Sequence, residues 1–504
     1  MKEQAIICAI STPAGSGGIA VVRLSGEGSI DLADKVFKAI SAKSLRDGMT
    51  SRLYYGEIVD RKDSEERECV SGGSTSGSSE SGEIGRGGSN SGEMVVDEVL
   101  LAIFRAPHSY TGEEVVEISC HGSVYIQQRI LQLLLSVGAR LAKPGEFTQR
   151  AFLNGKMDLS QAEAVGDLIA SCSAAAHRMT MNQMKGGFSA EIRSLRAEML
   201  RIITLLELEL DFSEEHEEFA DRSELLKLAT HIKKTLTHLS NSFSVGNVIK
   251  NGVPVAIVGN TNVGKSTLLN TLLHEEKAIV SEIAGTTRDV IEDTINLNGI
   301  TFRFIDTAGI RETSDEIETK GIERTFAKIE QASIILLITE IASCPAPLTS
   351  EHQPDDFAQY YKQVKSHQRE GTQLIILLNK VDEVTDYFTP LETIRLLTNG
   401  ETIIPISAKT GHNIPLLIDE LTNSVNVNSS TVSDVIVSNI RHYEALLHAG
   451  DAIERAIEGL GNKISDEFIA QDIRECMHYL GEITGEITTD EVLGEIFRGF
   501  CIGK

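Results

Sequence analysis

The sequence predicts a multidomain protein with an α+β domain, a helical domain, and an α/β domain that is inserted into the helical one. Three observations support this fold class. A chain of 504 residues is too long for one ordinary hydrophobic core. Strand-like segments dominate the first 155 residues, and between 252 and 424 they alternate with helical segments. Helical periodicity occupies both flanks of that alternating region, as expected for an insertion.

Residues 1–155 form the predicted N-terminal α+β domain. Its strand-like segments include AIICAIS, GIAVVRLSG and VVEISCHG, and one helix-like segment covers 123–138. Residues 71–92 contain 16 Ser or Gly among 22 positions, and they have too few apolar groups to offset the entropy of ordering. Because strand-like segments flank them at 52–60 and 94–107, we expect a flexible insertion that acts as an inert spacer within this domain.

Residues 156–250 and 425–504 are expected to form the two parts of the helical domain. Ser160 and Glu163 have the spacing of a capping box, which predicts that a helix begins there. A longer amphipathic helix follows, and we expect its apolar stripe to pack in a core. The stripe consists of Ile192, Leu195, Met199, Ile202 and Leu206.

Residues 251–424 form the predicted α/β domain. The segments PVAIVG, TFRFIDT, SIILLITE, LIILLNK and TIIPISA are nearly continuous apolar runs, typical of a parallel sheet covered on both faces. GNTNVGKS follows the first of them and matches the phosphate-binding loop G-x-x-x-x-G-K-S. Gly259 and Gly264 let the backbone approach phosphates. Lys265 supplies a positive charge, and the Ser266 hydroxyl can ligate Mg²⁺.

Three further motifs follow at the carboxyl ends of later strands. DTAG ends the strand TFRFI, which places Asp306 near the metal and the Gly309 N–H near the γ-phosphate. NKVD offers the Asp382 carboxylate to the N1–H and N2 amine of guanine, a donor pair that adenine lacks. SAK, residues 407–409, can present a backbone N–H to guanine O6. The four motifs in this order predict a GTPase.

The segment GTTRD, residues 285–289, lies where the first switch of a GTPase belongs. Thr287 is the candidate second ligand of Mg²⁺. Arg288 can serve as an arginine finger or form a local salt bridge, and the salt bridge is the favoured interpretation. Ile310 follows DTAG where Ras-like enzymes carry the glutamine that orients the attacking water. Another group must therefore orient the attacking water. The nearby candidates are the carboxylates of Glu312, Asp315, Glu316 and Glu318. Taken one by one, each is more typical of a solvent-exposed carboxylate in a switch segment than of a catalytic one.

Composition is that of an ordinary soluble protein, with 41% hydrophobic and 24% charged residues. The start MKEQAIICAI lacks the layout of a signal peptide, and no long apolar window is present, so we expect a cytoplasmic protein without a membrane span. Seven scattered cysteines without a CxxC motif argue against a disulfide framework and a zinc site. The net charge of −26 implies that a nucleic-acid partner needs a local basic patch or a second protein.

Several motifs together resemble the MnmE family of tRNA-modification GTPases, also called TrmE. They are GNTNVGKS, AGTTRD, DTAGIRETSDEIE and the terminal CIGK, together with flanking segments such as SYTGEEVVEISCHG, KPGEFTQRAFLNGKMDLSQAEAV and LGEITGEITTDEVLGEIFRGF. The resemblance covers nearly the whole chain except 64–93 and 343–371. It implies an N-terminal domain that binds a folate and dimerises, a central helical domain, and an inserted Ras-like P-loop domain.

The resemblance also implies GTP hydrolysis that potassium activates when two such domains meet across a homodimer. A monovalent cation supplies charge that an arginine finger would otherwise bring. Its ligands map to Asn262, Ser281, Ile283 and Thr286, and the water-positioning carboxylate maps to Glu318. The expected GTP-binding residues are Asn262, Val263, Gly264, Lys265, Ser266, Thr267, Ser281, Glu282, Ile283, Ala284, Gly285, Thr286, Thr287, Asp306, Thr307, Ala308, Gly309, Asn379, Lys380, Val381, Asp382, Ser407, Ala408 and Lys409.

The folate site that the resemblance implies maps to Arg23, Glu117, Lys156 and Lys504. Arg23 and the lysines suit the carboxylates of folate, and Glu117 can accept hydrogen bonds from the pterin ring. The implied ligand is 5-formyl- or methylene-tetrahydrofolate. The early loop PAGSGG lacks the Arg or Glu that the family often has there, a departure that can alter folate affinity.

The implied reaction adds an aminomethyl or carboxymethylaminomethyl group at C5 of the tRNA wobble uridine, with folate as the one-carbon donor. An FAD-dependent partner, MnmG or GidA, is expected to form a heterotetramer with the homodimer. The acidic net charge fits a protein that leaves most tRNA contact to this partner. The acidic segment 211–219 resembles an interhelical loop of the family, and we interpret it as a solvated loop in preference to a metal site.

Two other function classes stay open as alternatives: a regulatory GTPase of ribosome assembly and a membrane-associated GTPase. The sequence after SAK contains no basic RNA-binding domain, which weighs against the first. No basic amphipathic segment supports the second.

The terminal segment FCIGK raises three possibilities for Cys501: a lipid-anchor site, a frayed helix end or a reagent. Gly503 and a final lysine are unsuitable for prenylation. Because Lys504 maps to the folate site, we expect the terminus to be tied down. The Cys501 thiol would then lie near the one-carbon unit as a nucleophile or an acid–base group.

Overall fold

The computed structural model contains two compact units. The first consists of the residues up to Gly166 together with those from Thr484 onward, and the second of Asp167–Ile483. The multidomain fold class is confirmed, whereas the three predicted domain boundaries stay predictions. The described residues are 5–40, 44–46, 49–60, 94–211, 222–260, 262–277, 293–305, 329–343, 356–369, 371–384, 388–398, 400–425, 435–462 and 464–503.

A seven-stranded sheet forms the centre of the first unit, with the strand order β3-β4-β5-β6-β2-β1-β7. Neighbouring strands pair antiparallel except β1 and β7, which are parallel. The strands are β1 (Ile7–Ile10), β2 (Ile19–Ser25), β3 (Phe37–Ala39), β4 (Arg52–Asp60), β5 (Met94–Phe104), β6 (Val115–His121) and β7 (Arg140–Leu141). The predicted strand-like segments of this region are thus confirmed.

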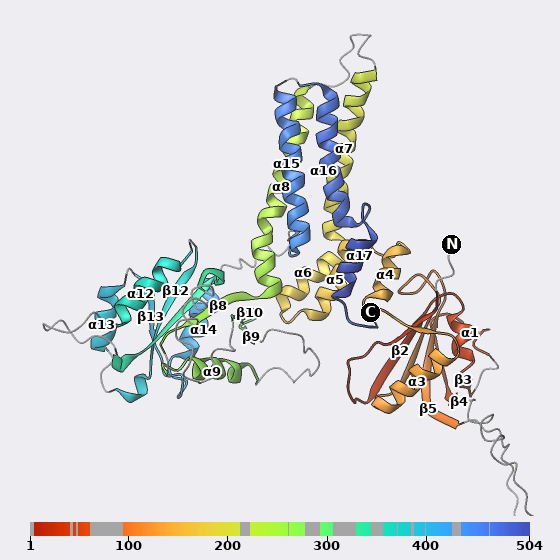
Figure 1. Cartoon of the computed structure of the whole chain (residues 1–504), viewed down its shortest axis with the longest axis horizontal. Coiled ribbons are helices and arrows are strands. Elements are labelled where there is room, and N and C mark those ends of the chain that lie inside the picture. Colours follow the sequence, from red (N-terminus) through yellow and green to blue (C-terminus); the bar gives the residue numbers. More distant parts are fainter. Residues whose placement is uncertain are drawn as a thin grey trace, which may run out of the picture. The chain divides into compact units, whose positions relative to one another are not determined.

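Two helices, α1 (Ser29–Asp34) and α3 (Val124–Ser136), contribute to the core of this sheet. Alternate strand residues such as Leu24, Leu101 and Ile118 are completely buried in that core, as the period of two in a strand requires. The other helices in the described part of the first unit are α4 (Glu146–Leu153), the beginning of α5 (Leu159–Ala170), and α17 (Asp490–Arg498). Figure 1 shows α3 lying across the strands.

The helix α5 begins before the predicted position. Asp158, not Ser160, is the cap: its Oδ1 accepts the Gln161 N–H at 3.0 Å, and the Gln161 Oε1 accepts the Asp158 N–H at 3.0 Å. This reciprocal pair is a capping box, shifted two residues from the predicted Ser160–Glu163 pair. Both predicted residues lie inside the helix and are buried, so tertiary packing uses them instead.

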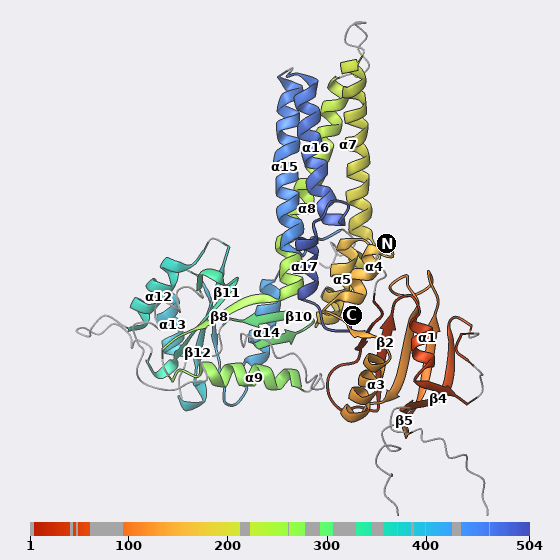
Figure 2. The same cartoon turned by 45° about the vertical axis from the view of Figure 1, so that its right-hand side comes forward.

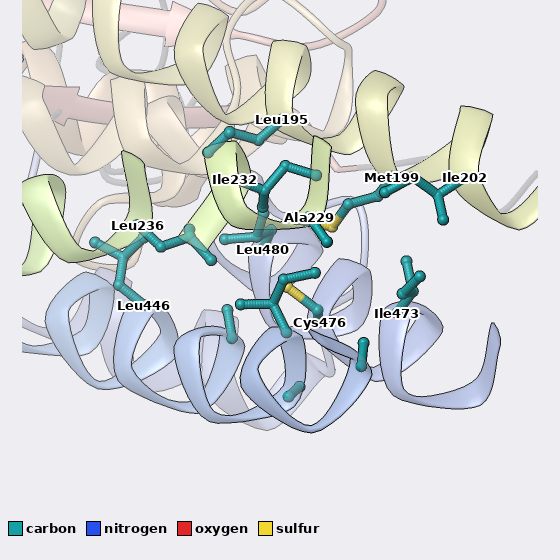
Figure 3. Close-up of a cluster of buried hydrophobic side chains, with 14 of the residues drawn as sticks. Leu195, Met199, Ile202, Ala229, Ile232, Leu236, Leu446, Ile473, Cys476 and Leu480 are labelled. Carbon is teal, nitrogen blue, oxygen red and sulfur yellow. The ribbon is translucent and has the colours of Figure 1, made fainter. Parts of the chain in front are cut away.

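Four long helices of the second unit pack side by side (Figures 1 and 2). They are α7 (Gly187–Asp211), α8 (Arg222–Asn251), α15 (Ile440–Gly461) and α16 (Asp466–Thr484), and the shorter α6 (Ala174–Met184) precedes them. The predicted apolar stripe of α7 is confirmed, because all five of its residues are buried. Figure 3 shows part of this core, in which Met199 of α7, Ile232 of α8 and Ile473 of α16 are buried together.

The two chain segments that border the α/β domain meet at α8. A Cβ added to Gly246 would lie 2.0 Å from the Val437 oxygen, so only glycine permits this approach. The Val437 N–H donates to the Ser242 Oγ at 3.0 Å. The outgoing helix and the returning segment are therefore held together directly, and α7 and α8 share one core with α15 and α16.

A six-stranded sheet forms the α/β domain, with the order β13-β12-β11-β8-β10-β9 and only β9 antiparallel to its neighbour. The helices α9 and α14 pack on one face, and α12 and α13 on the other. The strands are β8 (Val253–Val258), β9 (Asp293–Leu297), β10 (Ile300–Phe304), β11 (Ile334–Glu340), β12 (Gln373–Asn379) and β13 (Thr402–Pro405). The helices among the described residues of this domain are α9 (Lys265–Lys277), α12 (Asp356–His367), α13 (Phe388–Leu397) and α14 (Ile414–Ser424).

Among the described strands of the α/β domain, β9 alone was not predicted as a strand; in the first unit, the short strands β3 and β7 were not predicted either. The strand β9 forms the edge of its sheet as the first strand of a hairpin with β10, closed by the turn residues Asn298 and Gly299. The predicted spacer 71–92 lies outside the described residues, as does nearly all of the acidic segment 211–219. Among the described residues, no helix is both long and apolar enough to cross a membrane.

The shared helical core yields a first prediction. Leu236 is 1% exposed and packs within that core, so Leu236→Ala should lower the free energy of unfolding by about 2–5 kcal/mol. The control Leu200→Ala changes a side chain of α7 that is 55% exposed, and it should change stability by only about 0.5 kcal/mol. Urea unfolding followed by circular dichroism measures both, and equal losses would contradict the prediction.

Candidate functional site

The loop between β8 and α9 carries the predicted phosphate-binding motif. Gly259 begins the loop, and an added Cβ there would lie 2.2 Å from the Ile338 oxygen. Gly264 has φ 99°, and its added Cβ would lie 2.2 Å from the Asn379 side chain. Both glycines are therefore required by close packing as well as by the turn of the backbone.

Asn379 joins three of the predicted motifs through one side chain. Its Nδ2 donates to the Val263 oxygen at 2.7 Å, and its Oδ1 accepts the Ala408 N–H at 2.9 Å. The residue is 3% exposed and ends β12. Its amide thus fixes the phosphate-binding loop and the SAK segment relative to each other. The Asn379 side chain can occupy this position only because Gly264 has no Cβ.

The Asp382 carboxylate, predicted to recognise guanine, is anchored by the SAK segment. A hydrogen bond with the Ser407 hydroxyl, assisted by the charge of Lys409, lowers the pKa of Asp382. Ser407 is completely buried, and its Oγ also accepts the Thr410 N–H at 3.2 Å. The carboxylate is therefore ionised and oriented, which suits the acceptance of two N–H hydrogen bonds.

Two further side chains at this site belong to none of the predicted motifs. Glu340 ends β11 opposite Asn379, and its Oε2 lies 3.0 Å from the Lys380 Nζ. Thr271 of α9 donates to the Ala408 oxygen at 2.7 Å, which ties the helix to the SAK segment. The position of Glu340 at the end of a strand adjacent to NKVD was the only available signal.

Lys265 and Ser266 begin α9, at the helix N-terminus that faces the loop. The Lys265 Nζ donates to the Gly259 and Asn260 oxygens at 2.7 and 2.6 Å. The structure therefore places the lysine ammonium against the loop that would surround a phosphate. Asn262 has φ 62°, a left-handed conformation typical of such turns.

The remaining predicted nucleotide and cation ligands lie outside the described residues. They are Ser281, Glu282, Ile283, Ala284, Gly285, Thr286, Thr287, Asp306, Thr307, Ala308 and Gly309, and the same holds for the candidate catalytic Glu318. Their roles stay predictions.

A second group of predicted residues lies on the sheet of the first unit. The register of β2 and β6 places Arg23 opposite Glu117. Both the Arg23 Nε and Nη2 contact Glu117 Oε1, at 2.8 and 2.7 Å. The side chains are 20% and 29% exposed, so the ion pair is partly shielded from water and accessible to a ligand.

Two aromatic rings contact this ion pair. The Arg23 guanidinium carbon lies 5.4 Å from the Tyr110 ring centroid and 5.8 Å from that of Phe147. The Tyr110 hydroxyl is hydrogen-bonded to Thr148 Oγ1 at 2.9 Å, and burial raises the pKa of Tyr110. Phe147 is completely buried. The sequence did not predict either ring as part of the site, because their segments matched only the family resemblance and no separate chemical motif.

An ion-pair network anchors α4, which carries Phe147. Arg150 is 4% exposed and contacts Glu113 at 3.0 Å and Glu146 at 3.1 Å. Burial by itself raises the pKa of Glu146, but hydrogen bonds from Arg140, the Lys143 N–H and Arg150 outweigh it and lower that pKa to about 2. Glu146 thus stays ionised, and the helix is held to the sheet.

The C-terminal segment is tied to the same unit. The Ser11 Oγ donates to the Gly503 oxygen at 3.1 Å, and the Gly145 N–H donates to the Cys501 oxygen at 3.4 Å. A Cβ added to Gly503 would lie 2.3 Å from the Ile10 oxygen, so glycine permits the approach. The terminus is docked beside β1, while the Cys501 side chain is exposed.

Lys156 contacts the segment that carries Tyr110, at Pro107 and Gly112. Its Nζ donates to the Pro107 oxygen at 3.0 Å, and its stem passes 3.3 Å from the Cβ position of Gly112. Lys504 lies outside the described residues. Of the four predicted folate residues, the structure therefore brings Arg23 and Glu117 into direct contact.

Comparisons with known proteins agree with this architecture. The family model for the MnmE helical domain matches residues 159–501, and that for the GTP-binding protein TrmE N-terminus matches residues 6–156. The tRNA modification GTPase MnmE of Parabacteroides distasonis is 51% identical over 500 residues, which are 99% of each chain. The corresponding proteins of Bacteroides thetaiotaomicron and Flavobacterium johnsoniae are 50% and 47% identical and are covered completely.

The bridging role of Asn379 leads to a prediction. Asn379→Ala removes both hydrogen bonds and leaves the Val263 oxygen and the Ala408 N–H without this partner. The affinity for guanine nucleotide should fall by about 2–3 kcal/mol, or roughly 30- to 150-fold. Titration with a fluorescent GDP analogue measures this. The control Asn241→Ala alters an exposed residue of α8 and should bind normally; normal binding by Asn379→Ala would contradict the assignment.

Proposed function

Because the chain belongs to the MnmE (TrmE) family of tRNA modification GTPases, we propose that it couples GTP hydrolysis to modification of the wobble uridine of tRNA. The product carries an aminomethyl or carboxymethylaminomethyl group at C5. The observation that carries the nucleotide part is the Asn379 side chain, which joins the phosphate-binding loop to the base-recognition segment.

Each described residue of the nucleotide site has a role in this proposal. Lys265 binds the β- and γ-phosphates, and the N–H groups of the loop and of the first turn of α9 face the phosphate oxygens. Asp382 accepts hydrogen bonds from N1–H and N2 of guanine, while Ser407 holds its carboxylate in place. Ala408 and Lys409 complete the pocket for the base.

Ser266 and Thr287 would hold Mg²⁺. Ser266 fits because its hydroxyl is an oxygen ligand and follows directly after Lys265 in the first turn of α9. Bound Mg²⁺ would neutralise part of the negative charge of the phosphates. Glu318 would orient the attacking water, since Ile310 occupies the position of the usual glutamine.

Potassium is proposed as the second cation, held by Asn262, Ser281, Ile283 and Thr286. The left-handed turn at Asn262 supports the loop geometry that such a ligand needs. This cation supplies positive charge near the phosphates, and an arginine finger is then unnecessary. The arrangement requires two α/β domains from a homodimer.

The first unit is proposed to bind a reduced folate as the one-carbon donor. Support comes from the partly exposed Arg23–Glu117 pair, from Lys156, which donates a hydrogen bond to Pro107, and from the docked C-terminal segment that carries Cys501. Cys501 would then act on the one-carbon unit. An FAD-dependent protein is proposed as the partner that completes the modification and contributes most of the tRNA contact.

A deletion strain tests the proposed reaction. Without this protein, the C5 modification of wobble uridine should disappear from tRNA, as measured by mass spectrometry of nucleosides. The wild-type chain should restore it, whereas Cys501→Ser should restore less than about one hundredth of the activity if the thiol reacts. The control Cys172→Ser changes another exposed free cysteine and should restore modification fully.

Two results would count against that scheme. Normal wobble modification with defective ribosomal subunits would favour a regulatory GTPase of ribosome assembly. Full restoration by Cys501→Ser, with folate bound normally, would make the cysteine structural.

The cation and water-positioning roles make a separate prediction. GTP hydrolysis should be faster in potassium than in sodium, and equal rates would refute the proposed cation site. Glu318→Ala should lose about 10²-fold or more of the hydrolysis rate while keeping GTP affinity. Glu392→Ala, which removes an exposed carboxylate of α13, is the control and should hydrolyse GTP normally.

A further inference from the structure

The ion pair between Arg23 and Glu117 constrains what each side chain can do for a ligand. Two Arg23 nitrogens lie within 2.8 Å of a single Glu117 oxygen. Side chains in such contact meet the same part of a bound molecule. This restricts the roles assigned to them from the sequence, in which Arg23 binds the folate carboxylates and Glu117 binds the pterin.

Folate is an elongated molecule with the pterin at one end and the glutamate at the other. A residue that binds the glutamate must therefore lie far from a residue that binds the pterin. Arg23 and Glu117 are adjacent, so they act at one end. The pterin presents two neighbouring N–H donors, which suit a carboxylate and which a guanidinium cannot bind, because it has only donors.

We propose that Arg23 is a positioning residue that fixes the Glu117 carboxylate for the pterin and does not bind the glutamate of folate. The rings of Tyr110 and Phe147 contact the Arg23 guanidinium and help to hold it beside Glu117. The inference rests on the proposed folate function of the first unit and deepens it.

The hydrogen bonding of Glu117 supports this division of labour. Both contacts from Arg23 fall on Oε1, and a carboxylate offers about four acceptor sites in total. Among the residues that the structure describes, none donates a hydrogen bond to Oε2. Oε2 is thus available for the N–H groups of a pterin while Oε1 stays bound to Arg23.

The surroundings of Arg23 hold the guanidinium at Glu117. Its central carbon lies within 6 Å of two ring centroids, one of them on the completely buried Phe147. Tyr110 is in turn fixed by Thr148, and α4 is anchored by the buried Arg150. Moving the guanidinium to a distant carboxylate would break a charge-assisted pair and two ring contacts together.

Two ligands and a double-mutant cycle test the proposal on the full-length chain. The ligands are 5-formyltetrahydrofolate and 5-formyltetrahydropteroate, which lacks only the glutamate. The variants are Arg23→Gln, Glu117→Gln and the double variant, with calorimetric titration as the measurement. Arg52→Gln alters an exposed arginine of β4 in the same sheet and serves as the matched control.

The positioning role predicts that Arg23→Gln weakens both ligands by the same factor, about 10- to 100-fold. In the Glu117→Gln background the same change should cost less than about threefold, because the group that Arg23 positions is already altered. Arg52→Gln should bind both ligands normally. If Arg23→Gln does not fold, Arg23→Lys keeps the charge but loses the fork, and it should again weaken both ligands equally.

Other outcomes would overturn the proposal. A loss confined to the glutamate-bearing ligand would show that Arg23 binds the glutamate. Equal losses in the wild-type and Glu117→Gln backgrounds would indicate a general structural role. Failure of the wild-type chain to bind either ligand would remove the proposed folate function itself, which is distinct from both of these results.

Discussion

The close approach of α8 to the returning chain at Gly246 is the constraint on which the rest of the second unit depends. An inserted domain requires its two connections to lie together, and here a backbone oxygen occupies the place of a side chain. The hydrogen bond from Val437 to Ser242 fixes that contact. Beside this junction, α7 and α8 share a core with α15 and α16, which lie on the far side of the insertion in sequence.

The nucleotide site follows a similar rule, in which one buried side chain organises segments that are distant in sequence. Asn379 occupies the space that Gly264 leaves open and bonds to backbone groups of two loops. These hydrogen bonds hold the two loops relative to each other, which lowers the share of the binding energy that their ordering would use. The parallel sheet delivers all three segments to one edge, where ligands of such sheets bind.

The first unit contains two kinds of ion pair, one partly exposed and one buried. Its partly exposed Arg23–Glu117 pair and its buried Arg150 network lie on neighbouring elements, and the network is fully paired where water is excluded. The partly exposed pair keeps acceptor capacity for a ligand, whereas the buried pairs fix α4 and its aromatic ring. Ion pairs in this unit thus have two roles. The buried ones stabilise the fold, and the partly exposed one is available to recognise a ligand.

The sequence by itself determined the order of elements, because apolar periodicity and turn residues act locally. It also determined the nucleotide motifs, whose residue types match the chemistry of phosphate and guanine. It did not predict the strand β9, the true cap Asp158 or the ion partner Glu340, since each depends on a neighbour brought close by folding. The contact of Arg23 with Glu117 was likewise decided only by the tertiary structure, because β2 and β6 pair across 94 residues of chain and their register sets which side chains meet.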